Sequence, residues 1–172
     1  MAIRTIITAP DPRLKTVSEP VEAVDGGVRA LVDDMFETMY DAPGIGLAAI
    51  QIGVPKRIVV MDLANEEAPP DPRCFVNPEV TWISEDLASY EEGCLSVPDY
   101  YAEVSRPAQA RVKYLDRDGT ACELDADGLL ATCIQHEIDH LNGVLFVDHI
   151  SSVRRSIILR KLTKAKRLAA AE

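Results

Sequence analysis

Residues 128–141 read GLLATCIQHEIDHL, and the predicted fold is organised around this stretch. Leu130, Ile134, Ile138 and Leu141 recur at intervals of three and four, which is typical of a helix with one apolar face. Gly143 follows closely and is a helix stop signal. The sequence therefore predicts a helix over about 128–141 that packs its apolar face against a core.

The same helix carries His136 and His140, with Glu137 directly after the first histidine. Side chains at positions i and i+4 lie one above the other, about 5–6 Å apart at Cβ, so both imidazoles can bind one metal ion. A glutamate at this place is typical of a general base that acts on water at the metal. The residues that share this face and should line the site are Leu129, Thr132 and Cys133. The motif is short, and an ordinary helix with two histidines is the alternative.

A third ligand would decide the kind of metal site. Zincin-type peptidases take it from downstream, where Asp148, His149 and Glu172 are the candidates, but none lies in a zincin-like context. Upstream, Cys94 of EEGCLS (91–96) follows a glycine, and a thiolate is a good ligand for a borderline divalent metal. Cys94 with the two histidines would leave the open fourth position of a catalytic site. A metallopeptidase that uses the same helix remains the alternative.

Helices are also expected near both ends of the chain. Val28, Leu31, Val32, Met35 and Met39 predict an amphipathic helix over about 26–41. DAPG (41–44) should end it, because proline disfavours helix in the residue before it. A third helix is expected over about 151–170.

The segment between these helices has the pattern of strands. RIVVMD (57–62) is typical of a buried strand and NEEAPPDP (65–72) of an exposed loop. From 74 to 125, short β-rich runs alternate with turns: CFVN, EVTWIS, YYAEV, QARVKYLD and TACELD, with DRDG (116–119) as a hairpin turn between the last two. We therefore predict an α+β fold in a single domain, 1–172. Mostly antiparallel strands should pack around the central metal-binding helix, with an N-terminal helix and a C-terminal helix.

Composition and charge restrict the class of protein. The 172 residues are 47% hydrophobic and 27% charged, without an apolar run that could span a bilayer and without a signal-peptide pattern, so a cytoplasmic protein with no membrane partner is expected. Most of the four cysteines should be small buried side chains. The net charge is −10, but residues 154–172 carry seven basic side chains and one acid. This basic end predicts either an anionic partner or a solvated helix face.

GIGLAAIQ (44–51) is a third motif. It fits a loose dinucleotide-binding pattern, but that pattern needs a strand before it and a helix after it, and here a helix precedes it. Instead, Gly44 and Gly46 should let a substrate backbone approach, and Gln51 should turn its amide inward as a donor.

In this order, GIGLAAIQ, EGCLS (92–96) and QHEIDH (135–140) resemble the peptide deformylase family. PDPRL near the N-terminus, RDG in the hairpin and ADGLLATCIQHEIDHLNGVLFVD extend the resemblance to about residue 165. It implies an enzyme that removes the N-formyl group from the initiator methionine of new polypeptides. It also implies the metal ligands Cys94, His136 and His140, the catalytic Glu137, and oxyanion donors from the Gln51 side chain and the Leu95 N–H. The metal would be one Fe²⁺ per chain, although Zn²⁺, Ni²⁺ or Co²⁺ can occupy such sites.

The resemblance also implies how the partner, an N-formylmethionyl peptide, would bind. The peptide should lie as an added strand against residues 44–46, with its formyl group beside Gly46. The expected substrate-binding residues are Gly44, Ile45, Gly46, Glu92, Gly93, Leu129 and Cys133. Thr132 and Tyr101 depart from the residues common in bacterial members, and Arg106 should pair with Glu92. The basic C-terminal helix would contact the ribosome.

Overall fold

The computed structural model describes residues 1–171. Its helices are α1 (Gly26–Asp41), α2 (Gly128–Leu141) and α3 (Ser152–Ala170), with short 3₁₀ turns η1 (Pro12–Lys15), η2 (Ala49–Ile52) and η3 (Phe146–His149). Its strands are β1 (Gly46–Ala48), β2 (Ile58–Met61), β3 (Arg73–Ile83), β4 (Leu87–Cys94), β5 (Val97–Pro107), β6 (Ala110–Leu115) and β7 (Ala121–Ala126).

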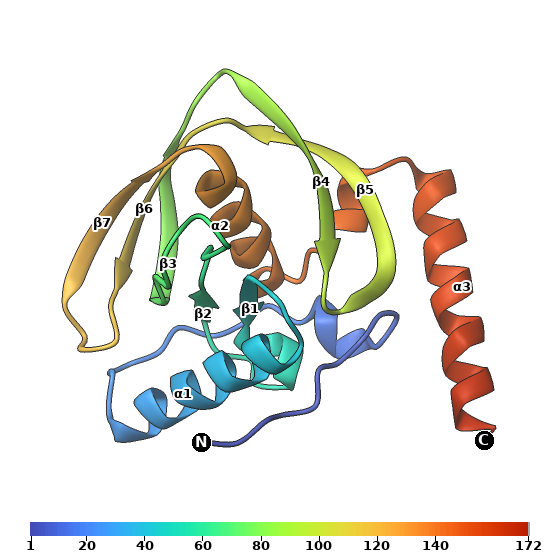
Figure 1. Ribbon diagram of the computed structural model, residues 1–172, viewed down its shortest axis with the longest axis horizontal. Helices are drawn as coiled ribbons and strands as arrows, with labels where there is room; N and C mark the ends of the chain where they lie inside the picture. Colours follow the sequence, from blue (N-terminus) through green and yellow to red (C-terminus); the bar gives the residue numbers. More distant parts are fainter. Residues whose placement is uncertain (172) are drawn as a thin grey trace.

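Helix α2 occupies the centre of the fold, between two antiparallel sheets (Figure 1). The larger sheet has the strand order β1–β2–β3–β6–β7, and the smaller one is the hairpin β4–β5. Helix α1 packs against β1 and β2, whereas α3 stands outside the hairpin. The predicted α+β class is confirmed, with antiparallel strands around a central helix and further helices toward each end of the chain.

The apolar face of α2 packs on the larger sheet. Ile134, Ile138 and Leu141 are buried in one cluster with Phe75 of β3, while Leu130 packs at its edge and is half-buried. The polar face of α2 is therefore left to meet the hairpin, and this is where the histidines lie.

Replacing Ile134 by alanine should lower the free energy of unfolding by about 2–5 kcal/mol, because the side chain is fully buried and would leave a cavity. Urea denaturation of the protein measures this difference. Val153→Ala on α3, where the valine is 68% exposed, is the control and should change the stability by less than about 0.5 kcal/mol. Equal effects of the two changes would contradict the placement of Ile134.

Helix α1 has the boundaries predicted from its sequence. The Asp25 carboxylate accepts a hydrogen bond from the Val28 N–H at 2.9 Å and caps the first turn. The helix ends at Asp41, directly before Ala42-Pro43. Its buried residues Met35 and Met39 pack in a second cluster with β1 and β2, so α1 supports the strand that precedes Gln51.

Two predicted strands, CFVN and EVTWIS, form one strand, β3. The expected break falls at Asn77, which adopts a left-handed φ of 51° and precedes Pro78. The register of β3 against β6 shifts there, as in a β-bulge, so the strand bends but continues. The Asn77 amide stabilises the bend by bonding the backbone N–H and carbonyl of Val21. The sequence therefore correctly indicated a change of backbone direction at Asn77-Pro78, but the prediction that a strand ends there was wrong.

The sequence did not predict strand β4, which reads LASYEEGC. Most of its side chains are exposed or half-buried, so it lacks the apolar alternation that identifies a strand. Pairing with the longer β5, from Leu87↔Pro107 to Cys94↔Val97, holds it in place. The turn of this hairpin is Leu95-Ser96, so EEGCLS is a strand end and its turn.

The expectation that most cysteines are buried was wrong. Cys133 is buried, but Cys74, Cys94 and Cys122 are partly exposed. Burial still raises the pKa of Cys74 to about 12, which keeps its thiol protonated. The exposed fraction alone therefore does not separate a structural cysteine from a functional one here.

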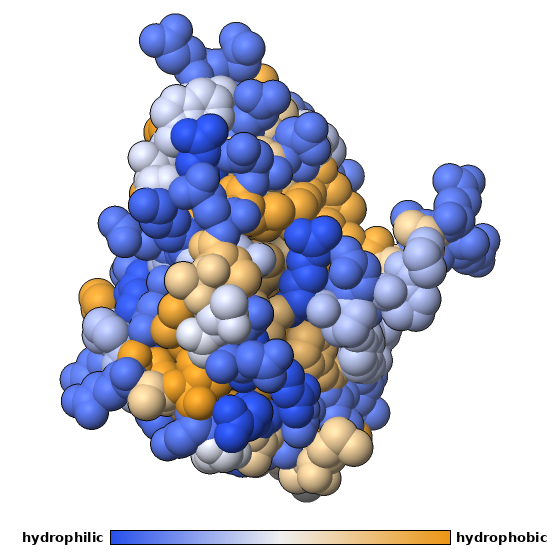
Figure 2. Space-filling view, turned by 90° about the vertical axis from the view of Figure 1, so that its left-hand side faces the viewer, coloured by the Kyte–Doolittle hydropathy of each residue, from blue (hydrophilic) through white to orange (hydrophobic). Residues whose placement is uncertain are grey.

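The outer strands of the larger sheet carry charge on the side away from the core. Arg111 of β6 lies opposite Asp125 of β7, with Nε and Oδ1 2.7 Å apart, and Lys113 lies opposite Glu123. Figure 2 shows this side of the molecule, where hydrophilic side chains lie around several smaller apolar areas. The exposed sheet is thus covered by cross-strand pairs of opposite charge.

Helix α3 is attached mainly through two residues. Ile158 and Leu162 are buried in a third cluster beneath the hairpin, together with Leu145 and Phe146, and most other side chains of α3 are exposed. Within residues 1–171, no helix has the length and apolar character needed to cross a membrane.

Candidate active site

Three side chains from two elements converge at the polar face of α2. Cys94 ends β4, and His136 and His140 lie one turn apart on α2. One ligand atom of each lies within 4.8 Å of the others, and Cys94 Sγ is 3.3 Å from His140 Nε2. Burial is the main cause that holds the pKa of His140 well below its ordinary value, so this imidazole is neutral, as a metal ligand must be. A thiolate and two imidazoles suit a borderline divalent metal.

The orientation of His136 is fixed from behind by Glu92. His136 Nδ1 lies 2.9 Å from Glu92 Oε1, so Nδ1 donates a hydrogen bond to this carboxylate, and Nε2 is the ring nitrogen available to bind a metal. Arg106 holds the same carboxylate with two hydrogen bonds, Nε to Oε2 at 2.7 Å and Nη2 to Oε1 at 2.9 Å. Burial pushes the pKa of Glu92 upward, but the bonds from His136 and Arg106 outweigh it and hold this pKa below its ordinary value. The predicted Arg106–Glu92 pair is confirmed.

Glu137 is buried beside this set. Its Oε1 is 3.9 Å from His136 Nε2, and its Oε2 has no hydrogen-bond partner among the described residues. Burial raises the pKa of Glu137 to about 7. A buried carboxylate with one free oxygen and a pKa near neutrality is suited to proton transfer.

Gln51 presents its amide nitrogen to the same space. Its Oε1 accepts the Ala48 N–H at 2.9 Å, so Nε2 points away from that strand, toward Ser96 Oγ at 3.0 Å and Cys94 Sγ at 3.5 Å. Because η2 places Gln51 three residues after Ala48, this local bond sets the direction of the donor. Leu95, the other predicted donor, lies in the adjacent hairpin turn.

The glycines of GIGLAAIQ make room for the protein itself. A Cβ at Gly46 would lie 2.7 Å from Glu137 Oε1, and a Cβ at Gly44 would lie 2.6 Å from Leu95 Cδ1. The expectation was that these glycines clear space for a substrate backbone, but the structure shows that side chains of the protein itself already need this space. The glycines let the Glu137 and Leu95 side chains reach the strand.

Substituting Gly46 by alanine should lower kcat for the hydrolysis proposed below by about tenfold or more, because the methyl group displaces the Glu137 carboxylate by a fraction of an ångström. Steady-state kinetics with circular dichroism measure activity and folding together. Gly26→Ala is the control, since a Cβ there meets nothing within 4 Å. Unchanged kcat in Gly46→Ala would show that the carboxylate position is not critical.

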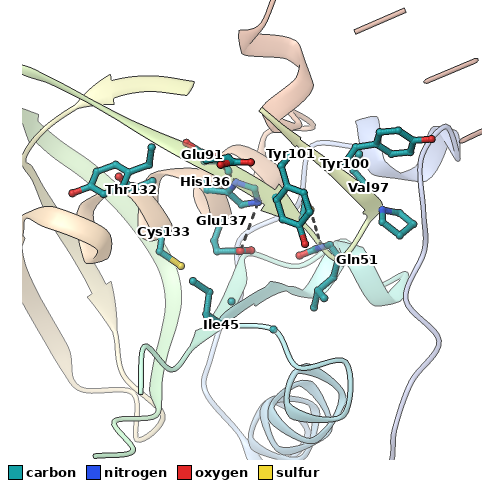
Figure 3. Close-up of a pocket in the computed structure, with 18 of the residues that line it drawn as sticks. Ile45, Gln51, Glu91, Val97, Tyr100, Tyr101, Thr132, Cys133, His136 and Glu137 are labelled. Atoms are coloured by element: carbon teal, nitrogen blue, oxygen red, sulfur yellow. Dashed lines mark hydrogen bonds and ion pairs between the residues drawn. The ribbon is translucent and has the colours of Figure 1, made fainter. Parts of the chain in front are cut away.

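A cleft of about 440 Å³ lies over these groups. In Figure 3, Ile45, Thr132 and Cys133 stand on one side of Glu137, and Gln51 stands on the other, with Tyr101 beside it. Every predicted site residue lines this cleft except His140, which lies fully buried below it. The sequence missed several lining residues: Pro43, Tyr90, Glu91, Val97, Pro98, Asp99 and Tyr100. Most belong to the β4–β5 hairpin, and the segment VPDYY directly after EEGCLS was the available signal.

The downstream candidates for a third ligand lie elsewhere. His149 Nε2 is 2.8 Å from Asp139 Oδ2, and Asp148 is paired with Lys15 and Arg155. Glu172 lies outside the described residues. The geometry thus brings Cys94, and not a downstream group, to the two histidines.

A family model described as polypeptide deformylase matches residues 3–156. The chain belongs to the polypeptide deformylase family. It is 62% identical to the peptide deformylase of Afipia carboxidovorans over 170 residues, which cover 99% of both chains. It is 60% identical to that of Methylocella silvestris, over 100% of this chain and 89% of the relative.

Solved deformylases have the same fold. The peptide deformylase of Ehrlichia chaffeensis in complex with actinonin superposes with a TM-score of 0.92 at 46% identity, covering 97% of this chain and 99% of that one. The deformylase of Legionella pneumophila gives a TM-score of 0.90 at 48% identity, covering 99% of each chain. As a deformylase, the chain is a metal-dependent hydrolase of protein biosynthesis that removes the N-formyl group of new polypeptides. The metallopeptidase alternative is not supported.

Proposed function

We propose that the cleft hydrolyses the formamide of N-formylmethionyl peptides, with Glu137 as general base and the whole chain, residues 1–172, as a single catalytic domain. The observation that carries this assignment is the free Glu137 Oε2, buried beside the ligand set Cys94, His136 and His140. We assign Fe²⁺ to these ligands on the resemblance, with Zn²⁺, Ni²⁺ or Co²⁺ as substitutes. Cys94, His136 and His140 would hold a divalent cation, which when bound would supply Lewis-acid chemistry to the formyl carbonyl and to the attacking water.

The protein groups move the proton and hold the developing charge. The Glu137 carboxylate takes a proton from the attacking water and later donates it to the leaving amine nitrogen, which releases formate and a free N-terminal methionine. Gln51 Nε2 and the Leu95 N–H donate to the oxygen that becomes negative as water attacks. The Ala48 and Ser96 bonds hold the Gln51 amide in place, so no reorganisation is needed at that moment.

The shape of the cleft supports selection of formyl and methionine. The Glu137 carboxylate already fills the space beside Gly46, so little room remains for the methyl of an acetyl group. The side chains of Ile45, Leu129, Thr132 and Cys133 offer a mostly apolar pocket for the methionine side chain. The peptide backbone would lie along Gly44–Gly46, and the Tyr101 ring, packed on Gly93, would border its later residues.

Formate release from formyl-Met-Ala-Ser tests the proposal, with acetyl-Met-Ala-Ser and free Met-Ala-Ser as controls and the bound metal quantified after anaerobic purification. Formate from the formylated peptide alone, with about one metal per chain, is the expected result. Absence of formate from fully metallated protein would refute the proposal. Loss of activity in air would support iron over zinc.

We further propose that α3 contacts the ribosome, which would place the enzyme in the cytoplasm beside its nascent substrate. Arg160, Lys164 and Arg167 are exposed and suit a phosphate-rich surface.

Replacing Arg160, Lys164 and Arg167 by glutamate should abolish co-sedimentation with ribosomes at low salt, because phosphate contacts become repulsive. Hydrolysis of the free tripeptide should not change, since none of these residues lines the cleft. Wild-type binding that is insensitive to salt, or retained by the triple variant, would contradict this contact.

A further inference from the structure

We propose that His149 is a positioning residue of the metal centre, although it lies outside the active-site cleft and behind helix α2. This inference rests on the proposed metal site. His149 reaches it through a continuous chain of hydrogen-bonded side chains that ends at His136.

The first two contacts of this chain meet at one carboxylate oxygen. Asp139 Oδ2 accepts from His149 Nε2 at 2.8 Å and from Arg106 Nη1 at 2.8 Å. Arg106 then holds both oxygens of Glu92 with Nε and Nη2, and Glu92 Oε1 binds His136 Nδ1. Four elements supply these residues, η3, α2, β5 and β4, so the chain of contacts joins parts of the fold that are distant in sequence.

The buried residues of this chain of contacts, Arg106 and Glu92, depend for their orientation on the partly exposed residues, Asp139 and His149. The Arg106 and Glu92 side chains are each 5% exposed, whereas those of Asp139 and His149 are 24% and 35% exposed. The buried guanidinium lies between two carboxylates, and its plane is set by both. If Asp139 turned toward solvent, Arg106 would lose the hydrogen bond from its Nη1, which fixes the orientation of the guanidinium. The two hydrogen bonds from Arg106 to Glu92 would then weaken.

His149 is the second group, besides Arg106 itself, that opposes this turn. Among the described residues, it is the only side chain besides Arg106 that bonds the Asp139 carboxylate. Asp139 and His149 line a groove behind α2, and Arg57, Gln135 and Asn142 line it too. Their side chains bond other groups: Arg57 and Asn142 bond each other, and Gln135 bonds backbone carbonyls. Loss of the imidazole therefore removes one of the two side-chain bonds that hold the Asp139 carboxylate, and the Arg106 bond alone is left to oppose its rotation toward solvent.

A merely structural role for His149 would be to fasten η3 to α2. Lys15 fastens the same turn through Asp148, at 2.6 Å, without touching Asp139. Lys15→Gln is thus a matched control, because it weakens the attachment of η3 but leaves the chain of contacts to His136 intact.

The test measures how fast a chelator strips Zn²⁺ from the loaded full-length protein. We expect release about tenfold faster in Asp139→Asn and about threefold faster in His149→Ala, since groups that orient a ligand control metal affinity. His149→Gln can still donate to Asp139 and should restore most of the wild-type rate. The Co²⁺ spectrum should shift in His149→Ala and not in Lys15→Gln. In His149→Ala, kcat for deformylation should fall while KM stays unchanged.

Wild-type release rates and Co²⁺ spectra in folded His149→Ala and Asp139→Asn would overturn the inference, even if the enzyme deformylates normally. An equal acceleration in Lys15→Gln would also overturn it, because the effect would then come from η3 as a whole. If His149→Ala fails to fold, His149→Gln and Asp139→Asn decide the matter by the same rates. A wild-type protein that binds no metal at all would instead refute the proposed function.

Discussion

Glu137→Gln should lower kcat for formate release by about 10²–10⁴-fold, because the amide cannot accept the proton from water. Glutamine keeps the shape of the side chain, so the cleft and the three proposed ligands should be preserved. Metal content of about one per chain therefore serves as the control, and rates with formyl-Met-Ala-Ser measure the loss. A variant that keeps more than a tenth of the wild-type kcat would exclude Glu137 as the base.

The pH profile gives the same assignment a second test. Burial raises the pKa of Glu137 to about 7, and the base must be ionised, so activity should fall as the pH drops below this value. A bound dication lowers the pKa, which places the midpoint at or below 7. The residual activity of Glu137→Gln should lack this acid limb.

Cys94→Ala should abolish deformylation and reduce bound metal from about one per chain to nearly none, because two imidazoles remain as the proposed ligands. Cys122→Ala is the matched control, since Cys122 is also partly exposed but lies on β7, outside the cleft lining. Metal analysis after gel filtration, together with formate release, measures both losses.

A Cys94→Ala protein that keeps its metal would contradict the proposed ligand set. Another residue would then have to be the third metal ligand. Retained metal together with cleavage of the Met-Ala bond would point back to a peptidase with the same helix.

Elements with a strong local signal could be predicted from the sequence. Helices α1 and α2 have the predicted bounds because their signals are local: Asp25 caps α1 and Ala42-Pro43 follows its end, whereas Gly143 follows the end of α2. Strand β4 could not be predicted, since its pairing partner and not its own pattern holds it in place. Strand β3 was divided wrongly because Asn77-Pro78 signals a turn, whereas two bonds to Val21 make it a bulge.

The candidate site shows the same limit. The residues that supply chemistry lie in short motifs, and the structure brings them together as expected. Their supports were harder to find, because Ser96 meets Gln51 and Asp139 meets Arg106 only through the register of the hairpin and its packing on α2. The glycines were identified for a different reason from the one the structure gives, since clearance depends on which side chain arrives from elsewhere.

The proposed ligands also come from different parts of the core. Cys94 packs with the cluster beneath the hairpin, whereas α2 packs its apolar face on the larger sheet. A cation shared by Cys94 and the two histidines would join two points of the folded chain that are 42 residues apart, and because it would bind the folded state alone, it would stabilise that state. The proposed metal centre would then also fasten the β4–β5 hairpin to the part of the fold that packs on the larger sheet, so loss of the metal should lower the stability of the protein as well as its activity.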